Sequence, residues 1–288
     1  MDYAVILVLQ IASAVASLVL ISLGLAVIFG MMRVINLAHG EFLMLGGYAA
    51  ITAYNNGVNL WLAMLIVAPV TVGLFGVVVE RLIIRHLYGR LIDTMLATWG
   101  LSLAMIGFVT VVFGNTVSGI SAPLGSMTIG AYRTGVYEVF LIFVALVLLA
   151  AGWAVLRHTR LGLIARGTMQ NANMAAALGV SPSLVYAVTF GIGAALSGLV
   201  GGLLAPLSGV VPTIGAAYIA KAFITVISGG AAILTGTAAA SGLLGSINTA
   251  ATFAFTPVLG EVALLAAAVI LLRILPQGIT GRFLQRSL

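Results

Sequence analysis

The sequence RHTRLGLIARGTMQNANMAAALGVSPS, from Arg157 to Ser183, is the one long polar stretch that is neither a chain end nor a plausible external loop. Long apolar segments lie on both sides of it. Within it, 173–178 predicts a short helix, because alanine has the highest helix propensity. Gly179 is a typical C-terminal stop, and Pro182 is expected to delay the next helix. The stretch predicts a small helix on a basic loop between two membrane anchors. It is either a docking element for another protein or an ordinary loop with a helical turn.

The composition of the chain places it in a membrane. Of its 288 residues, 62% are hydrophobic and 6% are charged, and the mean hydropathy is +1.25. A soluble domain carries about 25% charged residues. No polar run is long enough to fold separately, so we expect residues 1–288 to form a single transmembrane domain in which 157–183 is a cytoplasmic loop.

Charge and cysteine content exclude other classes of protein. The net charge of +6 comes from cations in short loops, as membrane topology requires, without the interleaved aromatic residues of a nucleic-acid-binding surface. We therefore expect no nucleic-acid partner. The lack of cysteine excludes disulfides and thiol chemistry. The three histidines are isolated from one another in the sequence, so we expect no metal site.

Apolar runs of about 20 residues predict transmembrane helices. The expected fold is an all-α, polytopic transmembrane helical bundle. A broken or re-entrant segment at either of the two least regular runs, 34–54 and 212–228, would leave eight crossings rather than nine. The nine expected segments are 4–30, 34–54, 60–82, 93–114, 138–156, 184–206, 212–228, 233–254 and 258–275.

The distribution of arginine predicts the orientation, because cytoplasmic loops are enriched in basic residues. If 157–183 is cytoplasmic and each segment crosses once, Arg133 falls outside. The N-terminus is then outside and the C-terminus is cytoplasmic. The arginines that fall on the inner side, besides those of 157–183, are Arg33, Arg81, Arg85, Arg90, Arg273, Arg282 and Arg286.

Glycine is abundant, with 35 residues, and most glycines are best explained by close helix packing. Gly229, Gly230 and Gly236 lie between two apolar segments and suit a tight turn. The external stretch 115–137 contains Pro123 and several Gly and Ser residues, which favours an irregular loop. The glycines at or near helical spacing are Gly198, Gly201, Gly202, Gly242 and Gly245.

Ionisable residues at membrane depth are costly and are functional candidates by default. His39 and Glu41 lie just after Arg33, at the start of an interrupted segment, and Gly40 is expected to weaken the helix there. Freed backbone groups would then line a water-filled cavity. The alternative is that His39 and Glu41 form a structural hydrogen-bonded pair near the inner interface.

Other polar side chains fall within the predicted segments. Lys221 lies near the middle of one segment; it contacts solute, extends to the interface, or pairs with a carboxylate such as Glu41 or Glu261. Thr94, Thr98 and Ser102 share one helix face, where they border a solute path or bond to their own helix backbone. The residues predicted for the translocation path are Asn36, His39, Glu41, Thr94, Thr98, Ser102, Lys221, Thr225 and Asn248.

The sequence contains no catalytic constellation. It has no Ser-His-Asp order, no phosphate loop of the GxxxxGK[ST] kind and no paired carboxylates in one segment. We therefore expect no catalytic residue, no metal and no cofactor in this chain. If the chain drives uphill transport, another subunit must supply the energy.

Three stretches together resemble the permease family of bacterial ABC importers for branched-chain amino acids, urea and short amides. The stretch 33–41, RVINLAHGE, is similar to the family's Ile-Asn-(Phe/Leu/Met)-Ala-His-Gly-Glu signature. The stretch 157–179, with its Ala-Ala-x-Leu-Gly ending, resembles the ATPase-docking loop. The stretch 220–230, with Lys-Ala-Phe followed by Ser-Gly-Gly, resembles a third family motif. The resemblance covers nearly the whole chain.

A fourth stretch bears on the substrate. Residues 86–100, HLYGRLIDTMLATWG, resemble the urea and amide branch, which favours Leu-Tyr-Gly-Arg-Pro-Leu and Leu-Ala-Thr-Trp-Gly. Leu91 and Ile92 replace the usual Pro-Leu, and Met95 replaces a leucine. The resemblance implies urea or a short amide as substrate first, and a branched-chain amino acid second.

The resemblance also implies the partners. They are a second permease subunit, two cytoplasmic ATPases that bind ATP and Mg, and an external solute-binding protein, assembled in the bacterial inner membrane. The second permease is usually a similar but distinct chain in this family, and a homodimer is the alternative. A stand-alone channel or secondary transporter and an intramembrane enzyme are the rival classes. The family resemblance assigns ATPase coupling in this chain to Gln170, Asn171, Asn173, Met174, Ala175, Ala176, Ala177, Leu178 and Gly179.

Overall fold

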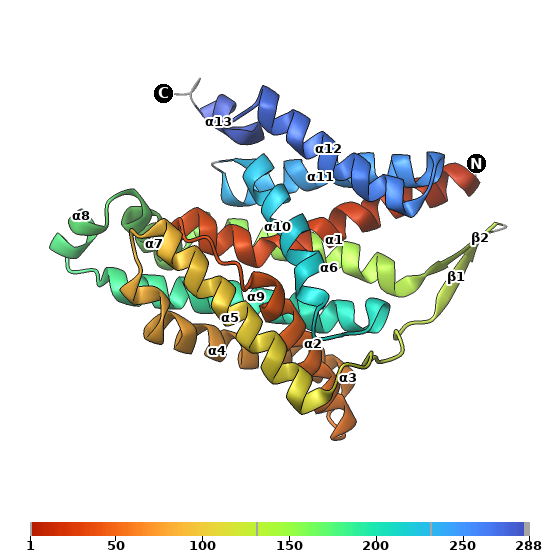
Figure 1. Ribbon diagram of the computed structural model, residues 1–288. Helices are drawn as coiled ribbons and strands as arrows, with labels where there is room; N and C mark the ends of the chain where they lie inside the picture. The colour runs from red at the N-terminus through yellow and green to blue at the C-terminus, as the bar shows by residue number, and fades with distance from the viewer. Residues whose placement is uncertain (1, 131, 231, 285–288) are drawn as a thin grey trace. The chain divides into compact units, whose positions relative to one another are not determined.

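The computed structural model describes residues 2–130, 132–230 and 232–284 and is mostly helical (Figure 1). Its one sheet in these ranges is the antiparallel hairpin of β1 and β2. The elements are α1 (Asp2–Met32), α2 (His39–Asn55), α3 (Leu60–Leu62), η1 (Ala63–Val67), α4 (Ala68–Leu82), η2 (Ile84–His86), α5 (Leu91–Phe113), β1 (Ser126–Ile129), β2 (Tyr132–Gly135), α6 (Val136–His158), α7 (Arg160–Gln170), α8 (Ala172–Ala177), α9 (Pro182–Ser208), α10 (Ile214–Gly229), α11 (Ile233–Ala254), α12 (Pro257–Ile274) and α13 (Gly278–Leu284).

Each of the nine predicted segments is largely helical, although 60–82 is divided into α3, η1 and α4 and 34–54 is helical only from His39. The number of crossings is not confirmed. Among the described residues, six helices are long and apolar enough to cross a membrane. A seventh span results if the bent pair α10–α11 counts as one. The helices α2 and α10 have 17 and 16 residues, fewer than the roughly 20 that a crossing requires. Both had been expected to be the irregular segments.

The chain divides into two compact units, and each is described by itself. The first unit comprises residues 1–22, 122–151 and 221–288, which hold most of α1, the hairpin, most of α6 and the helices from the second half of α10 onward. The second unit comprises residues 23–121 and 152–220. It holds α2 to α5 and α7 to α9.

In the second unit, α9 packs closely against both α2 and α4. A Cβ atom added at Gly201 would lie 1.8 Å from the carbonyl oxygen of Leu43 in α2, and one added at Gly46 would lie 2.2 Å from that of Gly198. On its other side, α9 packs against α4, where a Cβ at Gly76 would lie 2.3 Å from the Cβ of Ala194. The predicted role in close helix packing is confirmed for Gly198, Gly201 and Gly202.

In the first unit, α11 and α12 form an antiparallel pair whose apolar core includes Leu18, Leu244 and Leu264. A Cβ at Gly245 would lie 2.9 Å from Val15 Cγ2 in α1, whereas one at Gly242 would meet nothing within 4 Å. The packing prediction is therefore confirmed for Gly245 and wrong for Gly242.

The glycines between α10 and α11 act as predicted only in part. The backbone turns at Gly230, which has φ of +84°, a conformation that favours glycine. Gly236 lies inside α11 rather than in the turn, and a Cβ there would lie 2.6 Å from the carbonyl oxygen of Gly229. Thr280 in α13 fixes the C-terminal end of α10, because its hydroxyl donates to the carbonyl of Gly229, the last residue of that helix, at 2.6 Å.

Three local expectations are wrong. The next helix is not delayed by Pro182 but begins at it, because proline at the first helical position has the required φ and needs no N–H partner. Gly40 does not weaken a helix: it lies in the first turn of α2, where a Cβ would be 2.0 Å from the Gly215 carbonyl. The stretch 115–137 is not wholly irregular, since Ser126–Ile129 pairs with Tyr132–Gly135.

Candidate functional site

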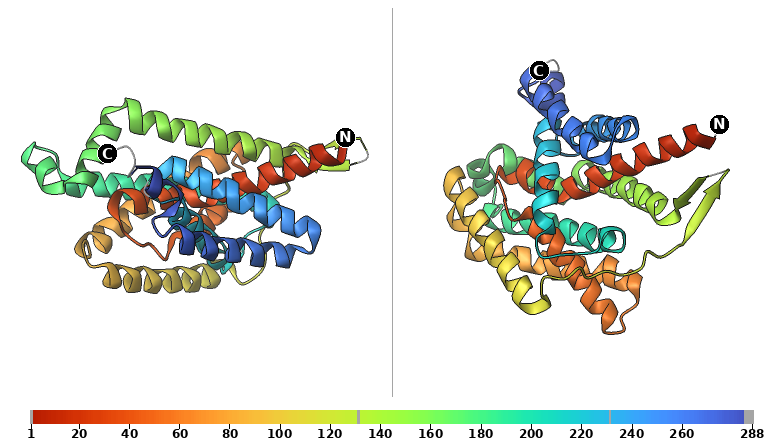
Figure 2. Two further views of the ribbon diagram at one scale, coloured as in Figure 1. Left: turned by 90° about the horizontal axis from the view of Figure 1, so that it is seen from above. Right: turned by 45° about the vertical axis from the view of Figure 1, so that its right-hand side comes forward.

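The segment between α6 and α9 is built from two capped helices. The Thr159 hydroxyl accepts a hydrogen bond from Gly162 N at 3.1 Å and caps α7, and Asn171 Oδ1 accepts from Met174 N at 2.9 Å and caps α8. Gly179, with φ of +87°, ends the second helix. The short helix agrees with the expected 173–178 to within a residue at each end, but α7 replaces the expected loop (Figure 2).

The short helix α8 presents an apolar surface to its surroundings. Ala175 is buried against its neighbours, whereas Met174 and Leu178, four residues apart, are 59% and 79% exposed. The other predicted coupling residues, Gln170, Asn171, Asn173, Ala176, Ala177 and Gly179, are all exposed. Figure 1 shows α8 where the chain turns back from α7 toward α9. A small helix with two exposed apolar side chains, anchored by a buried alanine, has the form of an element that docks into a groove.

The loop between α1 and α2 carries a buried polar cluster. Asn36 and His39 are fully buried and Glu41 is 2% exposed. Asn36 Oδ1 accepts from Ala38 N at 3.0 Å, which shapes the turn before α2. His39 Nδ1 lies 3.3 Å from the hydroxyl of Ser197 in α9.

Helix α5 contributes the rest of this cluster. The Thr98 hydroxyl accepts from Leu37 N at 3.1 Å, so it holds the loop, and it also lies 2.8 Å from the Thr94 carbonyl. The Thr94 hydroxyl donates to the Arg90 carbonyl at 2.8 Å. Ser102 is buried on the same helix, four residues after Thr98. The shared face of these three residues is confirmed, and so is the alternative in which the threonine hydroxyls bond to their own helix.

Two polar atoms of the cluster have no hydrogen-bond partner in the described structure. They are Asn36 Nδ2 and Glu41 Oε2, both inaccessible at the surface. A buried polar atom without a partner is costly, so the cluster retains hydrogen-bonding capacity for water or solute. The sequence did not indicate Ser197, because a serine among small residues of an apolar helix carries no distinguishing pattern.

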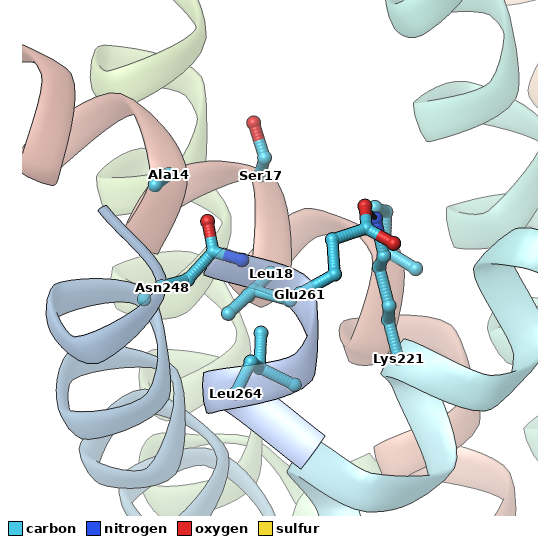
Figure 3. A pocket seen from close by; sticks show the side chains of 9 residues that line it. Ala14, Ser17, Leu18, Lys221, Asn248, Glu261 and Leu264 are labelled. Atoms are coloured by element: carbon cyan, nitrogen blue, oxygen red, sulfur yellow. Dashed lines mark hydrogen bonds and ion pairs between the residues drawn. The ribbon is translucent and has the colours of Figure 1, made fainter. Parts of the chain in front are cut away.

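The remaining predicted path residues, Lys221, Thr225 and Asn248, belong to the first unit. Lys221 Nζ lies 2.6 Å from Glu261 Oε1, so the alternative in which Lys221 pairs with Glu261 is confirmed. The Thr225 hydroxyl is fully buried and has no hydrogen-bond partner in the described structure. Lys221, Glu261 and Asn248 line one pocket of about 140 Å³ (Figure 3).

Residues 7–275 match the family described as "Branched-chain amino acid transport system / permease component". The chain is 27% identical over 285 residues to the high-affinity branched-chain amino acid transport system permease protein LivH of Escherichia coli K12, and 91% of each chain is covered. It is 30% identical over 287 residues to the protein of the same description, BraD, of Pseudomonas aeruginosa, again with 91% of each chain covered. No solved structure matches the chain significantly.

Proposed function

This chain belongs to the branched-chain amino acid transport permease family, and from that premise we propose that it is the permease subunit of an ATP-driven importer of branched-chain amino acids. It is a multi-pass inner-membrane protein, as predicted. Residues 1–288 act as one permease domain, with 157–183 as the coupling segment. The solute crosses by alternating access, and the chain itself carries out no chemical reaction.

The observation that carries the proposal is the exposed apolar helix α8 between two membrane-spanning helices. Met174 and Leu178 lie on its surface, and Pro182 begins α9 only a few residues later. A force applied to α8 is therefore delivered to the end of a buried helix. Moving a two-state equilibrium from 1:99 to 99:1 takes about 5.5 kcal/mol, which turnover of ATP on a partner supplies and contact with a loop alone does not.

The proposed assembly follows the predicted partners. Two cytoplasmic ATPases bind ATP and Mg, and one of them docks on α8 while the other docks on a second permease, which is a similar, distinct chain or a second copy of this one. An external solute-binding protein delivers the solute. With 157–183 in the cytoplasm, the N-terminus is outside and the C-terminus inside. Of the arginines that supported this orientation, Arg286 lies outside the described residues.

Urea or a short amide is the second candidate substrate. The observation that favours it is the stretch 86–100, which resembles the urea and amide branch. The similar curated proteins are instead named for branched-chain amino acids, so the amino acid takes first place. Competition against labelled leucine uptake by urea, acetamide and isoleucine separates the two, because under the first candidate isoleucine alone competes.

The coupling role is tested with Ala176→Arg, which puts a long cation on the exposed surface of α8. We expect the complex to insert and assemble, while ATP hydrolysis no longer drives uptake. His86→Arg is the matched control, because it adds a similar side chain to an exposed position outside the coupling segment. Normal uptake by the Ala176 variant contradicts the proposal, as does a purified wild-type chain that transports without any associated ATPase.

A further inference from the structure

A pocket of about 140 Å³ lies entirely within the first unit, lined by side chains from four helices. Its polar lining includes Lys221 from α10, Asn248 from α11 and Glu261 from α12 (Figure 3). Leu18 and Leu264 line it with apolar surface. The pocket is therefore small and amphipathic: its lining includes the two charged groups of Lys221 and Glu261 and the apolar side chains of Leu18 and Leu264.

The two charges of the pocket form a pair that has room for another partner. Lys221 Nζ and Glu261 Oε1 are 2.6 Å apart, and the two side chains are 31% and 58% exposed. An ammonium has three donors and a carboxylate about four acceptor sites, so each group has spare hydrogen-bonding capacity while the pair is intact. The site is neutral as a whole, which disfavours a ligand with a net charge.

The positions of Glu261 and Asn248 show how far the pocket lies from the ends of α11 and α12 that are joined to each other. Glu261 follows Pro257, the first residue of α12, by four positions, and Asn248 precedes Ala254, the last residue of α11, by six. At 1.5 Å per residue these offsets are about 6 and 9 Å. With these helix ends at the edge of a hydrocarbon layer of about 30 Å, as the proposed topology requires, both side chains lie within that layer. Charges at such a depth are costly, and in membrane proteins they often mark solute pathways.

We propose that this pocket binds a zwitterionic α-amino acid with a short aliphatic side chain. The Lys221 ammonium binds the carboxylate of the solute, and the Glu261 carboxylate binds its ammonium. The Asn248 amide donates to the solute carboxylate, and the aliphatic side chain lies against Leu18 and Leu264. The assignment rests on the proposed function, in whose orientation the ends of α11 and α12 beside the pocket face outward.

Ligand chemistry provides the first test, on the unaltered complex of permeases and ATPases in nanodiscs without the solute-binding protein. Saturation-transfer difference NMR measures binding of leucine, 4-methylpentanoate and 3-methylbutylamine. We expect each analogue, which lacks one of the two charges, to bind at least tenfold more weakly than leucine. Equal binding of leucine and either analogue overturns the proposal, and so does binding of urea in competition with leucine.

Substitution of the two charged residues provides the second test, which distinguishes a role in binding leucine from a role in holding the helices together. Lys221→Met and Glu261→Gln are expected to weaken leucine binding at least tenfold, whereas Glu138→Gln, the same change outside the pocket, leaves it unaltered. The double variant Lys221→Glu/Glu261→Lys restores the ion pair but reverses its polarity relative to Leu18 and Leu264. We expect it to assemble and still bind leucine at least tenfold more weakly.

The outcomes distinguish this inference from the proposed function. If the reversed pair binds leucine normally, the pair is structural and the pocket assignment is overturned, even when ATP-driven uptake confirms the importer. If the wild-type chain neither associates with an ATPase nor supports uptake, the proposed function fails first. If the single variants do not assemble, the analogue series on the unaltered complex still decides the question.

Discussion

The substitution Gly201→Ala tests the backbone contact between α2 and α9. The added Cβ would lie 1.8 Å from the Leu43 carbonyl oxygen. To reach an ordinary contact of 3.4 Å, the two backbones must separate by about 1.6 Å. Overpacking a core typically costs about 1–3 kcal/mol. We expect about 3 kcal/mol here, because a backbone carbonyl within a helix cannot rotate away as a flexible side chain does.

The measurement is the free energy of unfolding in mixed micelles, from the midpoint and slope of an SDS titration followed by circular dichroism. Gly107→Ala is the matched control: it lies inside α5, and its Cβ would meet nothing within 4 Å. Alanine is favoured over glycine in a helix by about 1 kcal/mol, so the control should be neutral or slightly stabilising. A Gly201 variant as stable as the control would refute the close approach of α2 and α9.

Three further predictions concern polar contacts. Tyr88→Phe removes the hydroxyl that donates to the fully buried Glu80 and should cost about 1.5–3 kcal/mol, whereas Tyr54→Phe at an exposed position should cost almost nothing. Burial, together with the hydrogen bond to Glu80 and the charge of Glu80, raises the pKa of Tyr88. The free energy of unfolding of wild type should therefore exceed that of Tyr88→Phe by a constant amount below about pH 10, the pKa of tyrosine in the unfolded chain, and by less above it. Glu41→Gln should lower the uptake rate more than the yield of assembled complex, and unchanged kinetics would make this carboxylate structural. Asn171→Ala removes the cap of α8 and should cost about 1 kcal/mol, seen as faster amide exchange in α8 with unchanged exchange in α9.

The sequence predicts well whatever depends on neighbours along the chain. Apolar runs place the long helices, and Asn171, the alanines and Gly179 place α8 to within a residue, because capping and helix propensity act locally. The helix α7 was missed because its arginines and glycines resemble a loop. Its signal was the Thr159 cap followed by the apolar spacing of Leu161 and Ile164.

Features that depend on contacts between residues far apart in the sequence were predicted less accurately. The start of α2 at His39 rather than at 34 follows a turn held by Thr98, which lies 61 residues from Leu37 in the sequence. Two carboxylates were named as partners of Lys221, and only the folded chain selects Glu261. A polar side chain in an apolar helix shows that a partner is needed, but not which one.

If α8 is displaced as proposed, the contacts of α9 provide a route from α8 to the buried polar cluster. Glycines place the backbone of α9 directly on that of α2, so no flexible side chains lie between them to absorb a small shift. The His39–Ser197 contact joins the same two helices at the first residue of α2. Under the proposed coupling, a tilt of α9 is therefore expected to carry α2, and with it Glu41, in the same direction. In the second unit, small residues and a polar contact, which the sequence presents as separate features, join the same two helices, α2 and α9.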